Sequence, residues 1–278
     1  MARRVAITGA GGQLGQELVR AFTAAGHEVI ELARPGFDIM DPGHVERLTS
    51  LRPDVVVNSA AWTDVDGCAR EPERAMAING EAAGAIARAA ADAGAVMVQI
   101  STNEVFDGSL DRPYAEEDAP NPINPYGASK LRGEELVALT APRHLIVRTA
   151  WLYGGPASFP SKIRAAAARM QLERRPLRVV ADEFGNPTHV AWLASAVERL
   201  VGRDDAAPGV WHLAGVPPVS RLEWAEAVLG DLAIRLEPIE SSEYPRASRV
   251  PLRAVLDVSR AGGLGLLAGG DWRLRPAG

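Results

Sequence analysis

The chain has 278 residues, enough for one large α/β domain or for one domain with a smaller lobe. Hydrophobic residues make up 47% of it and charged residues 23%, a composition that excludes a disordered or fibrous chain. The net charge of −5 argues against nucleic acid as a partner, because proteins that bind phosphate backbones usually carry a basic field.

Short β-branched runs alternate with stretches of helical length in the first half of the chain. The predicted strands are 5–8, 29–32, 55–58, 96–101 and 145–148, and the predicted helices are 12–26, 42–51, 72–93 and 125–139. This alternation predicts an α/β fold, a Rossmann-type doubly wound parallel sheet with crossover helices on both faces. We assign residues 1–153 to this dinucleotide-binding domain.

The pattern loosens after about residue 154, where proline, glycine and arginine become frequent. We expect residues 154–278 to form mainly a smaller, substrate-binding lobe. Its predicted elements are helices at 161–173, 190–201 and 221–229 and a strand at 177–180. Part of the segment 186–215 is expected to return to the first domain, because helix 190–201 can pack back onto the sheet.

A glycine-rich turn follows the first predicted strand. Gly9, Gly12 and Gly15 allow the backbone to turn sharply, to approach a pyrophosphate and to pack a helix closely on the sheet. The N–H groups at the start of the next helix, which includes Gln13 and Leu14, are free to bind the anion. Because it joins the first strand to the first helix of such a fold, this turn predicts a dinucleotide site.

The end of the second predicted strand indicates which nicotinamide cofactor binds. An acidic side chain there would bind the ribose hydroxyls of NAD, but Ala33 takes that position. Arg34 follows and can pair with a 2′-phosphate. We therefore expect NADPH, with NADH as the alternative because Glu31 lies close by.

Tyr126 and Lys130 stand four residues apart on a predicted helix, so their side chains share one face. The ammonium can then lie beneath the phenol and favour its ionised form, whereas an unperturbed tyrosine has a pKa of about 10. Thr102, which leaves the preceding strand, can bind the same substrate oxygen. These three residues predict carbonyl reduction, which needs a proton for the nascent alkoxide and a fixed hydrogen bond to the carbonyl.

Cysteine and histidine give little sign of metal chemistry. Cys68 is the single cysteine, which excludes an internal disulfide and is typical of a reducing cytoplasm. The five histidines have no metal-ligand spacing, so we expect no metal. No apolar run reaches the roughly 18 residues that span a bilayer, and no signal peptide is evident. We expect a cytoplasmic protein without a membrane partner.

The chain resembles the extended short-chain dehydrogenases and, within them, the dTDP-4-dehydrorhamnose reductases. The likeness covers most of the chain and rests on residues 12–15, 37–41, 52–66, 102–108, 126–134, 148–154 and 184–188. It implies an NAD(P)H-dependent oxidoreductase that reduces the C4 ketone of a dTDP-4-keto-6-deoxy sugar, giving dTDP-L-rhamnose. It also implies a monomer or a homodimer.

The resemblance implies further site residues. Along the cofactor these are Asp38, Ile39, Ala60, Ala61 and Thr63, with the first two near the adenine. On the substrate side Trp151 is expected against the sugar, and Asn103 and Glu104 beside it. The nucleotide diphosphate needs a cation, for which Arg253 is our candidate, with Arg164, Arg169 and Arg249 also available.

The chain departs from these reductases beside the sugar. They usually carry Thr-Asp-Tyr where this chain has Thr102-Asn103-Glu104, and an arginine of their C-terminal block is displaced to Arg253 or lost. Reduction of another nucleotide deoxysugar is therefore the first alternative. Sugar-nucleotide dehydratases have an Asp-Glu pair here, but Asn103 cannot act as an acid, and an epimerase would lack the blocks named above. A non-catalytic subunit would most simply have lost Tyr126 or Lys130.

Overall fold

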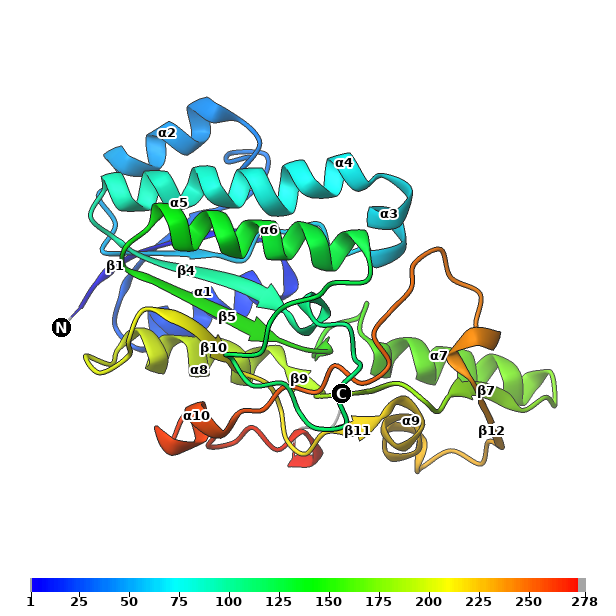
Figure 1. The fold of residues 1–278 in the computed structure, drawn as a ribbon. Helices are drawn as coiled ribbons and strands as arrows, with labels where there is room; N and C mark the ends of the chain where they lie inside the picture. Colours follow the sequence, from blue (N-terminus) through cyan, green and yellow to red (C-terminus); the bar gives the residue numbers. More distant parts are fainter. Residues whose placement is uncertain (1, 275–278) are drawn as a thin grey trace.

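The structure, a computed structural model, describes residues 2–274. Its centre is a six-stranded sheet of order β10-β5-β4-β3-β1-β2, in which every neighbouring pair is parallel (Figure 1). The strands are β1 (Arg4–Thr8), β2 (Glu28–Leu32), β3 (Val55–Asn58), β4 (Val96–Thr102), β5 (His144–Thr149) and β10 (Gly209–His212). The predicted Rossmann-type fold is confirmed.

Helices cover both faces of this sheet, because successive strand residues point to opposite sides. Val5, Ile7 and Val57 face one core, and Ala6, Val56 and Met97, among others, face the other. The covering helices are α1 (Gln13–Ala24) and α8 (Val190–Val201) on the first face, and α2 (Pro42–Ser50), α5 (Ala82–Asp92) and α6 (Pro125–Thr140) on the second. In Figure 1 the second group lies above the sheet.

The predicted helix 72–93 is not one regular α-helix. It consists of α4 (Pro72–Ala75), a π-helical stretch η1 (Met76–Glu81) and α5, and it is preceded by a short helix α3 (Val65–Arg70) that the sequence analysis missed. Asn79 in η1 is buried and donates to the Trp62 carbonyl at 3.0 Å while accepting from the Trp62 N–H at 2.8 Å. The π-helical stretch thus fixes the loop that follows β3.

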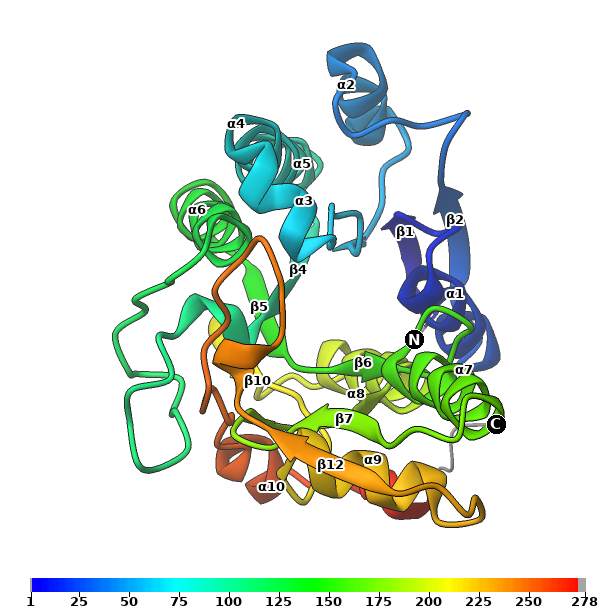
Figure 2. The same cartoon turned by 90° about the vertical axis from the view of Figure 1, so that its right-hand side faces the viewer.

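The remaining elements lie mostly in a smaller group beside the sheet, where Figure 2 shows β7, β12 and α9 together. The helices are α7 (Phe159–Leu172), α9 (Arg221–Leu229) and α10 (Ser259–Gly263), with 3-10 turns η2 (Asn103–Val105), η3 (Ser241–Glu243) and η4 (Trp272–Leu274). The short strands are β6 (Leu152–Tyr153), β7 (Leu177–Val180), β8 (Phe184–Gly185), β9 (Thr188–His189), β11 (Val219–Ser220) and β12 (Leu236–Ile239). No helix among residues 2–274 combines the length and apolar character of a membrane span.

Two elements of the second half return to the sheet. β10 pairs in parallel with β5 at the sheet edge, and α8 packs on the same face as α1 through Leu193, Ala196 and Val197. The return of helix 190–201 is expected from the sequence, whereas β10 has no counterpart among the predicted strands.

Candidate active site

The glycine turn after β1 leaves no room for a side chain at Gly9 or Gly15. Gly9 has a φ of +70°, and a Cβ atom there would lie 2.7 Å from the Ala60 nitrogen. A Cβ at Gly15 would lie 2.1 Å from the carbonyl oxygen of Gly9, which accepts the Gly12 N–H at 2.9 Å. The turn can therefore bring its backbone close to a ligand only because these positions are glycine.

The start of α1 is open to an anion. Gly12 is the N-cap and offers no side chain to accept the N–H groups of the first turn, which begins at Gln13. Gly12 and Gln13 are exposed, whereas Leu14 and Gly15 are buried against the sheet. Unpaired N–H groups at a helix N-terminus bind a pyrophosphate, so the turn fits a dinucleotide.

The predicted cofactor residues lie around the point where the order of the sheet reverses. The chain passes from β1 to β2 on one side and then to β3 on the other, and the Gly9 turn meets the Ala60 loop there. Ligands of doubly wound sheets bind at this point, outside the carboxyl ends of the strands. Ala60 and Ala61 are partly buried and Thr63 is exposed in this loop.

The segment after β2 lies at the same carboxyl edge of the sheet, on the other side of the Gly9 turn. Arg34 is exposed directly beyond the strand. Asp38 donates its backbone N–H to Nδ1 of His44 at 3.0 Å and accepts from the Met40 N–H at 2.9 Å, which fixes the loop. Ile39 is partly buried and packs on the core beneath α2. The structure thus groups these residues with the glycine turn at the carboxyl edge.

Thr102, Tyr126 and Lys130 come together at the carboxyl end of β4. Asn124 caps α6 by accepting the Gly127 N–H at 2.7 Å, and this places Tyr126 in the first turn. The Tyr126 phenol interacts with the hydroxyl of Thr102, the last residue of β4. Lys130, one turn further along α6, is buried and donates from Nζ to the Ile100 carbonyl at 2.6 Å.

The pKa of Tyr126 differs from the expectation. Burial and the negative charge of Glu104 raise the pKa of Tyr126, so the expectation of a readily ionised phenol is wrong for this structure. Burial lowers the pKa of Lys130 to about 8, and the carboxylate of Glu134 opposes that shift. At neutral pH Tyr126 therefore holds its proton and can act as an acid toward a strong base such as an alkoxide.

The Trp151 ring is held rigidly by contacts with α9. Its backbone has a φ of +44°, and its ring stacks on Trp224 at 5.7 Å between centroids. The guanidinium carbon of Arg221 lies 3.6 Å from the Trp151 ring centroid. A Cβ at Gly185 would lie 2.4 Å from the same ring, so Gly185 is required there.

The side chains of Asn103 and Glu104 form hydrogen bonds with different partners. Asn103 is buried, its amide donates to the Ala254 carbonyl at 2.9 Å, and its Oδ1 accepts from the Thr102 hydroxyl at 3.4 Å, so it joins the C-terminal segment to the end of β4. The Glu104 carboxylate accepts from the Asn124 amide at 2.7 Å. Burial raises the pKa of Glu104, although Asn124 and Arg221 oppose the shift.

The arginine nearest the predicted sugar site is one that sequence reasoning missed. Arg221 is the first residue of α9 and lies 3.5 Å from the buried carboxylate of Glu183, which also accepts from Arg246 at 2.6 Å. Arg253 is exposed, with its guanidinium carbon 4.3 Å from the Phe184 ring centroid. Within residues 2–274 no hydrogen bond or ion pair joins its side chain to the other predicted site residues.

The other candidate arginines form ion pairs with carboxylates or have exposed side chains. Arg164 forms an ion pair with Asp231 at 3.0 Å, and Arg169 lies 4.0 Å from Glu173. The side chain of Arg249 is exposed, although its carbonyl accepts from the Asn124 amide at 2.9 Å. A capping box of Ser220 and Glu223 marks the start of α9, but nothing local shows that Arg221 reaches Trp151.

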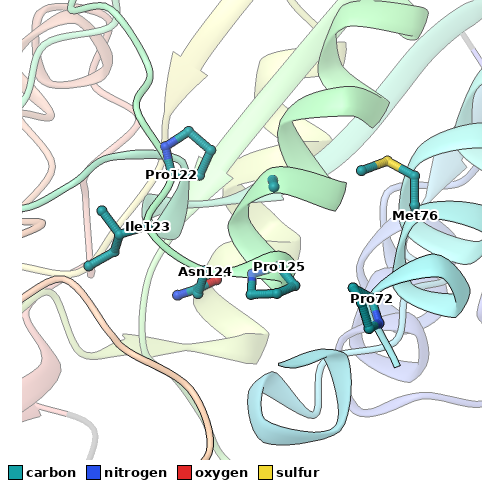
Figure 3. A pocket seen from close by; sticks show the side chains of 7 residues that line it. Pro72, Met76, Pro122, Ile123, Asn124 and Pro125 are labelled. Atoms are coloured by element: carbon teal, nitrogen blue, oxygen red, sulfur yellow. The ribbon is translucent and has the colours of Figure 1, made fainter. Parts of the chain in front are cut away.

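A pocket of about 350 Å³ lies beside the start of α6 (Figure 3). Its lining is mostly apolar and consists of Pro72, Met76, Pro122, Ile123, Asn124, Pro125 and Ala128. None of the predicted site residues lines this pocket, although Tyr126 directly follows Pro125 in α6. Among the described residues, no group of three or more His, Cys, Asp or Glu side chains is placed to hold a metal ion.

Comparisons with known proteins find relatives that match almost the whole chain. A dTDP-4-dehydrorhamnose reductase of Mycolicibacterium smegmatis is 38% identical over 98% of this chain and 84% of the relative. A spore coat polysaccharide biosynthesis protein of Bacillus subtilis is 39% identical over 91% and 88%. The crystal structure of a Bacillus anthracis dTDP-4-dehydrorhamnose reductase in complex with NADP has a TM-score of 0.90 at 31% identity, covering 99% of this chain and 97% of that one.

The family model for the RmlD substrate binding domain matches residues 3–276. This match and the near-complete coverage of the relatives extend over both the sheet and the smaller group of elements. The chain therefore belongs to the RmlD substrate binding domain family.

Proposed function

We propose that this protein catalyses the NADPH-dependent reduction of the C4 ketone of dTDP-4-dehydrorhamnose to dTDP-L-rhamnose. The observation that carries the proposal is the grouping of Thr102, Tyr126 and Lys130 at the edge of the sheet where the Gly9 turn also lies. Relatives named for this reaction support the substrate, and the NADP complex of a relative supports the cofactor.

The cofactor and the three side chains have separate roles in the proposed reaction. The nicotinamide supplies a hydride to C4 when the cofactor is bound. The hydroxyls of Thr102 and Tyr126 bind the C4 oxygen, and Tyr126 donates its phenolic proton to the oxygen as the carbonyl becomes an alcohol. Lys130, charged and adjacent on α6, stabilises the phenolate that Tyr126 leaves behind.

Other residues of the site are assigned to the sugar and the diphosphate. Trp151 is assigned to contact the sugar ring, and Glu104 is assigned to accept a hydrogen bond from a sugar hydroxyl. Arg221, stacked on Trp151, is better placed than the exposed Arg253 to bind a phosphate. Asn103 supports the substrate site through the Ala254 backbone.

In this proposal the two parts of the chain bind different ligands. Residues 1–153, together with α8 and β10, bind the cofactor, and the rest of 154–278 binds mainly the substrate. We propose a monomer or a homodimer. The single buried cysteine, Cys68, agrees with a cytoplasmic location, where thiols stay reduced.

Replacing Arg34 with alanine tests the cofactor choice. We expect KM for NADPH to rise about 10-fold, because a charge-assisted hydrogen bond to the 2′-phosphate is lost, while KM for NADH changes little. Steady-state kinetics with both cofactors measure the effect. Arg47, an exposed arginine on α2, is the control position. Equal changes for the two cofactors would rule out a 2′-phosphate contact by Arg34.

The pH dependence tests the role of Lys130. Because kcat/KM reports ionisations of the free enzyme, it is expected to fall as the pH rises through about 8, where Lys130 loses its charge. The deprotonated lysine no longer stabilises a phenolate, so the loss should appear on the alkaline limb. A profile that stays level well above this pH would remove Lys130 from the chemistry.

The direct test uses purified protein, NADPH or NADH, and a 4-keto-6-deoxy sugar nucleotide made in situ from dTDP-glucose by a 4,6-dehydratase. Cofactor oxidation that requires added 3,5-epimerase is the expected result. Oxidation without the epimerase would instead favour another deoxysugar, an alternative that Glu104 supports because it puts a carboxylate beside the sugar. No oxidation with either substrate would contradict the proposed reductase.

A further inference from the structure

Glu134 is a buried carboxylate that the reaction described above does not use. It lies on α6 one turn beyond Lys130, and only 4% of its surface is exposed. Arg148 on β5 donates to it from Nε at 3.0 Å and from Nη2 at 2.7 Å, and the Ser101 hydroxyl on β4 donates to Oε1. Three elements of the site therefore meet at this one side chain.

Arg148 depends on Glu134 for its compensating charge. It is 3% exposed, and Glu134 is its one ion-pair partner within residues 2–274. His212 is its direct neighbour on β10, but burial and the charge of Arg148 lower the pKa of His212 to about 3, so the ring is neutral at ordinary pH. A buried guanidinium without its carboxylate is strongly unfavourable, so the pair is firmly held.

Glu134 in turn acts on Lys130 in two ways. Its negative charge raises the pKa of Lys130 against the effect of burial. Its bond to Ser101 fixes the strand segment whose preceding residue, Ile100, accepts the Lys130 ammonium at 2.6 Å. The residue after Ser101 is Thr102, so the same contact also supports the hydroxyl that is assigned to the substrate carbonyl.

The other charged and titratable groups around Lys130 do not replace Glu134. Tyr126 on α6 keeps its proton, and Arg148 on β5 carries the same sign of charge as Lys130. His212 on β10 is neutral. Arg132 on α6 forms an ion pair with the exposed carboxylate of Glu81, with 3.1 Å between Nε and Oε1.

We propose that Glu134, locked by Arg148 and Ser101, is a positioning residue that keeps the Lys130 ammonium charged and fixed against the end of β4. This role deepens the proposed reductase function and rests on it for its effect on turnover. The effect on Lys130 itself needs neither substrate nor cofactor.

The composition of the chain makes the effect directly measurable. The sequence contains only two lysines, Lys130 and Lys162, and Lys162 is exposed on α7. Selective labelling of lysine with ¹³C or ¹⁵N therefore gives two side-chain signals, which an NMR titration follows separately. Lys162 serves as the internal reference.

The experiment compares Glu134→Gln with Glu135→Gln, the same change at the next residue, where the side chain is exposed. Glutamine keeps the size of the side chain and removes its charge. In E134Q the pKa of Lys130 is expected to fall by about one unit while that of Lys162 stays the same. The alkaline limb of kcat/KM should move to lower pH by the same amount, a loss of about fivefold at pH 8.

An unchanged pKa of Lys130 in folded E134Q, or an equal shift in E135Q, would overturn the proposal. If E134Q does not fold because Arg148 is left unpaired, the double variant E134Q with Arg148→Gln removes both charges. Because loss of the Arg148 charge by itself raises the pKa of Lys130, the reference for that variant is R148Q. A lower pKa of Lys130 in the double variant than in R148Q supports the proposal, and an equal value overturns it. A clear shift in a protein that reduces no dTDP-sugar would contradict the proposed function alone.

Discussion

Replacing Tyr126 with phenylalanine is expected to lower kcat for carbonyl reduction by about 100- to 10,000-fold, the range for loss of a positioned proton donor. KM for NADPH should change little, because the glycine turn that binds the pyrophosphate is untouched. The disappearance of NADPH absorbance under saturating sugar nucleotide measures the loss. The phenylalanine ring fills the same space, so thermal unfolding should stay close to that of the wild type.

The matched control for this variant is Tyr244→Phe, since Tyr244 is 52% exposed and lies outside the site. It should retain wild-type turnover. If Y126F also kept wild-type turnover, the proton would have to come from elsewhere, and Glu104, whose charge acts on Tyr126, would be the next group to replace. A full cellular role for a Y126F protein without turnover would support a non-catalytic subunit instead.

Replacing Gly15 with alanine is the second change with a large expected effect. The new Cβ would lie 2.1 Å from the Gly9 oxygen and 2.8 Å from the Ala10 Cα, both backbone atoms that cannot rotate away. We expect the turn to move, NADPH affinity to fall at least about 100-fold and the free energy of unfolding to drop by about 1–3 kcal/mol. Fluorescence titration with NADPH and urea denaturation measure the two effects.

Gly263→Ala in α10 is the control, because nothing lies within 4 Å of a Cβ there. This control should change NADPH affinity little and should leave the shape of the glycine turn unchanged. Undiminished NADPH binding by G15A would exclude the Gly9–Gly15 turn as the pyrophosphate site, since the turn cannot keep its shape around that methyl group.

Most of the sheet could be predicted from the sequence, because a buried parallel strand needs a run of apolar residues that is visible locally. Val55, Val56 and Val57 are an example, with all three side chains fully buried in β3. The missed strand β10 has only four residues, two of them Trp211 and His212, and its place is set by pairing with β5. No local pattern distinguishes such a strand from a loop.

In the candidate site too, only residues that are close together along the chain could be predicted from the sequence. Glycine spacing and the four-residue interval between Tyr126 and Lys130 are properties of one turn and one helix, so the sequence by itself determined them. Only the tertiary structure placed Arg221 on Trp151, 70 positions earlier in the chain, and Glu134 beside Arg148. It also decided that the pKa of Tyr126 rises, because burial and the charge of Glu104 depend on how distant segments pack, and spacing along the chain carries no information about that packing.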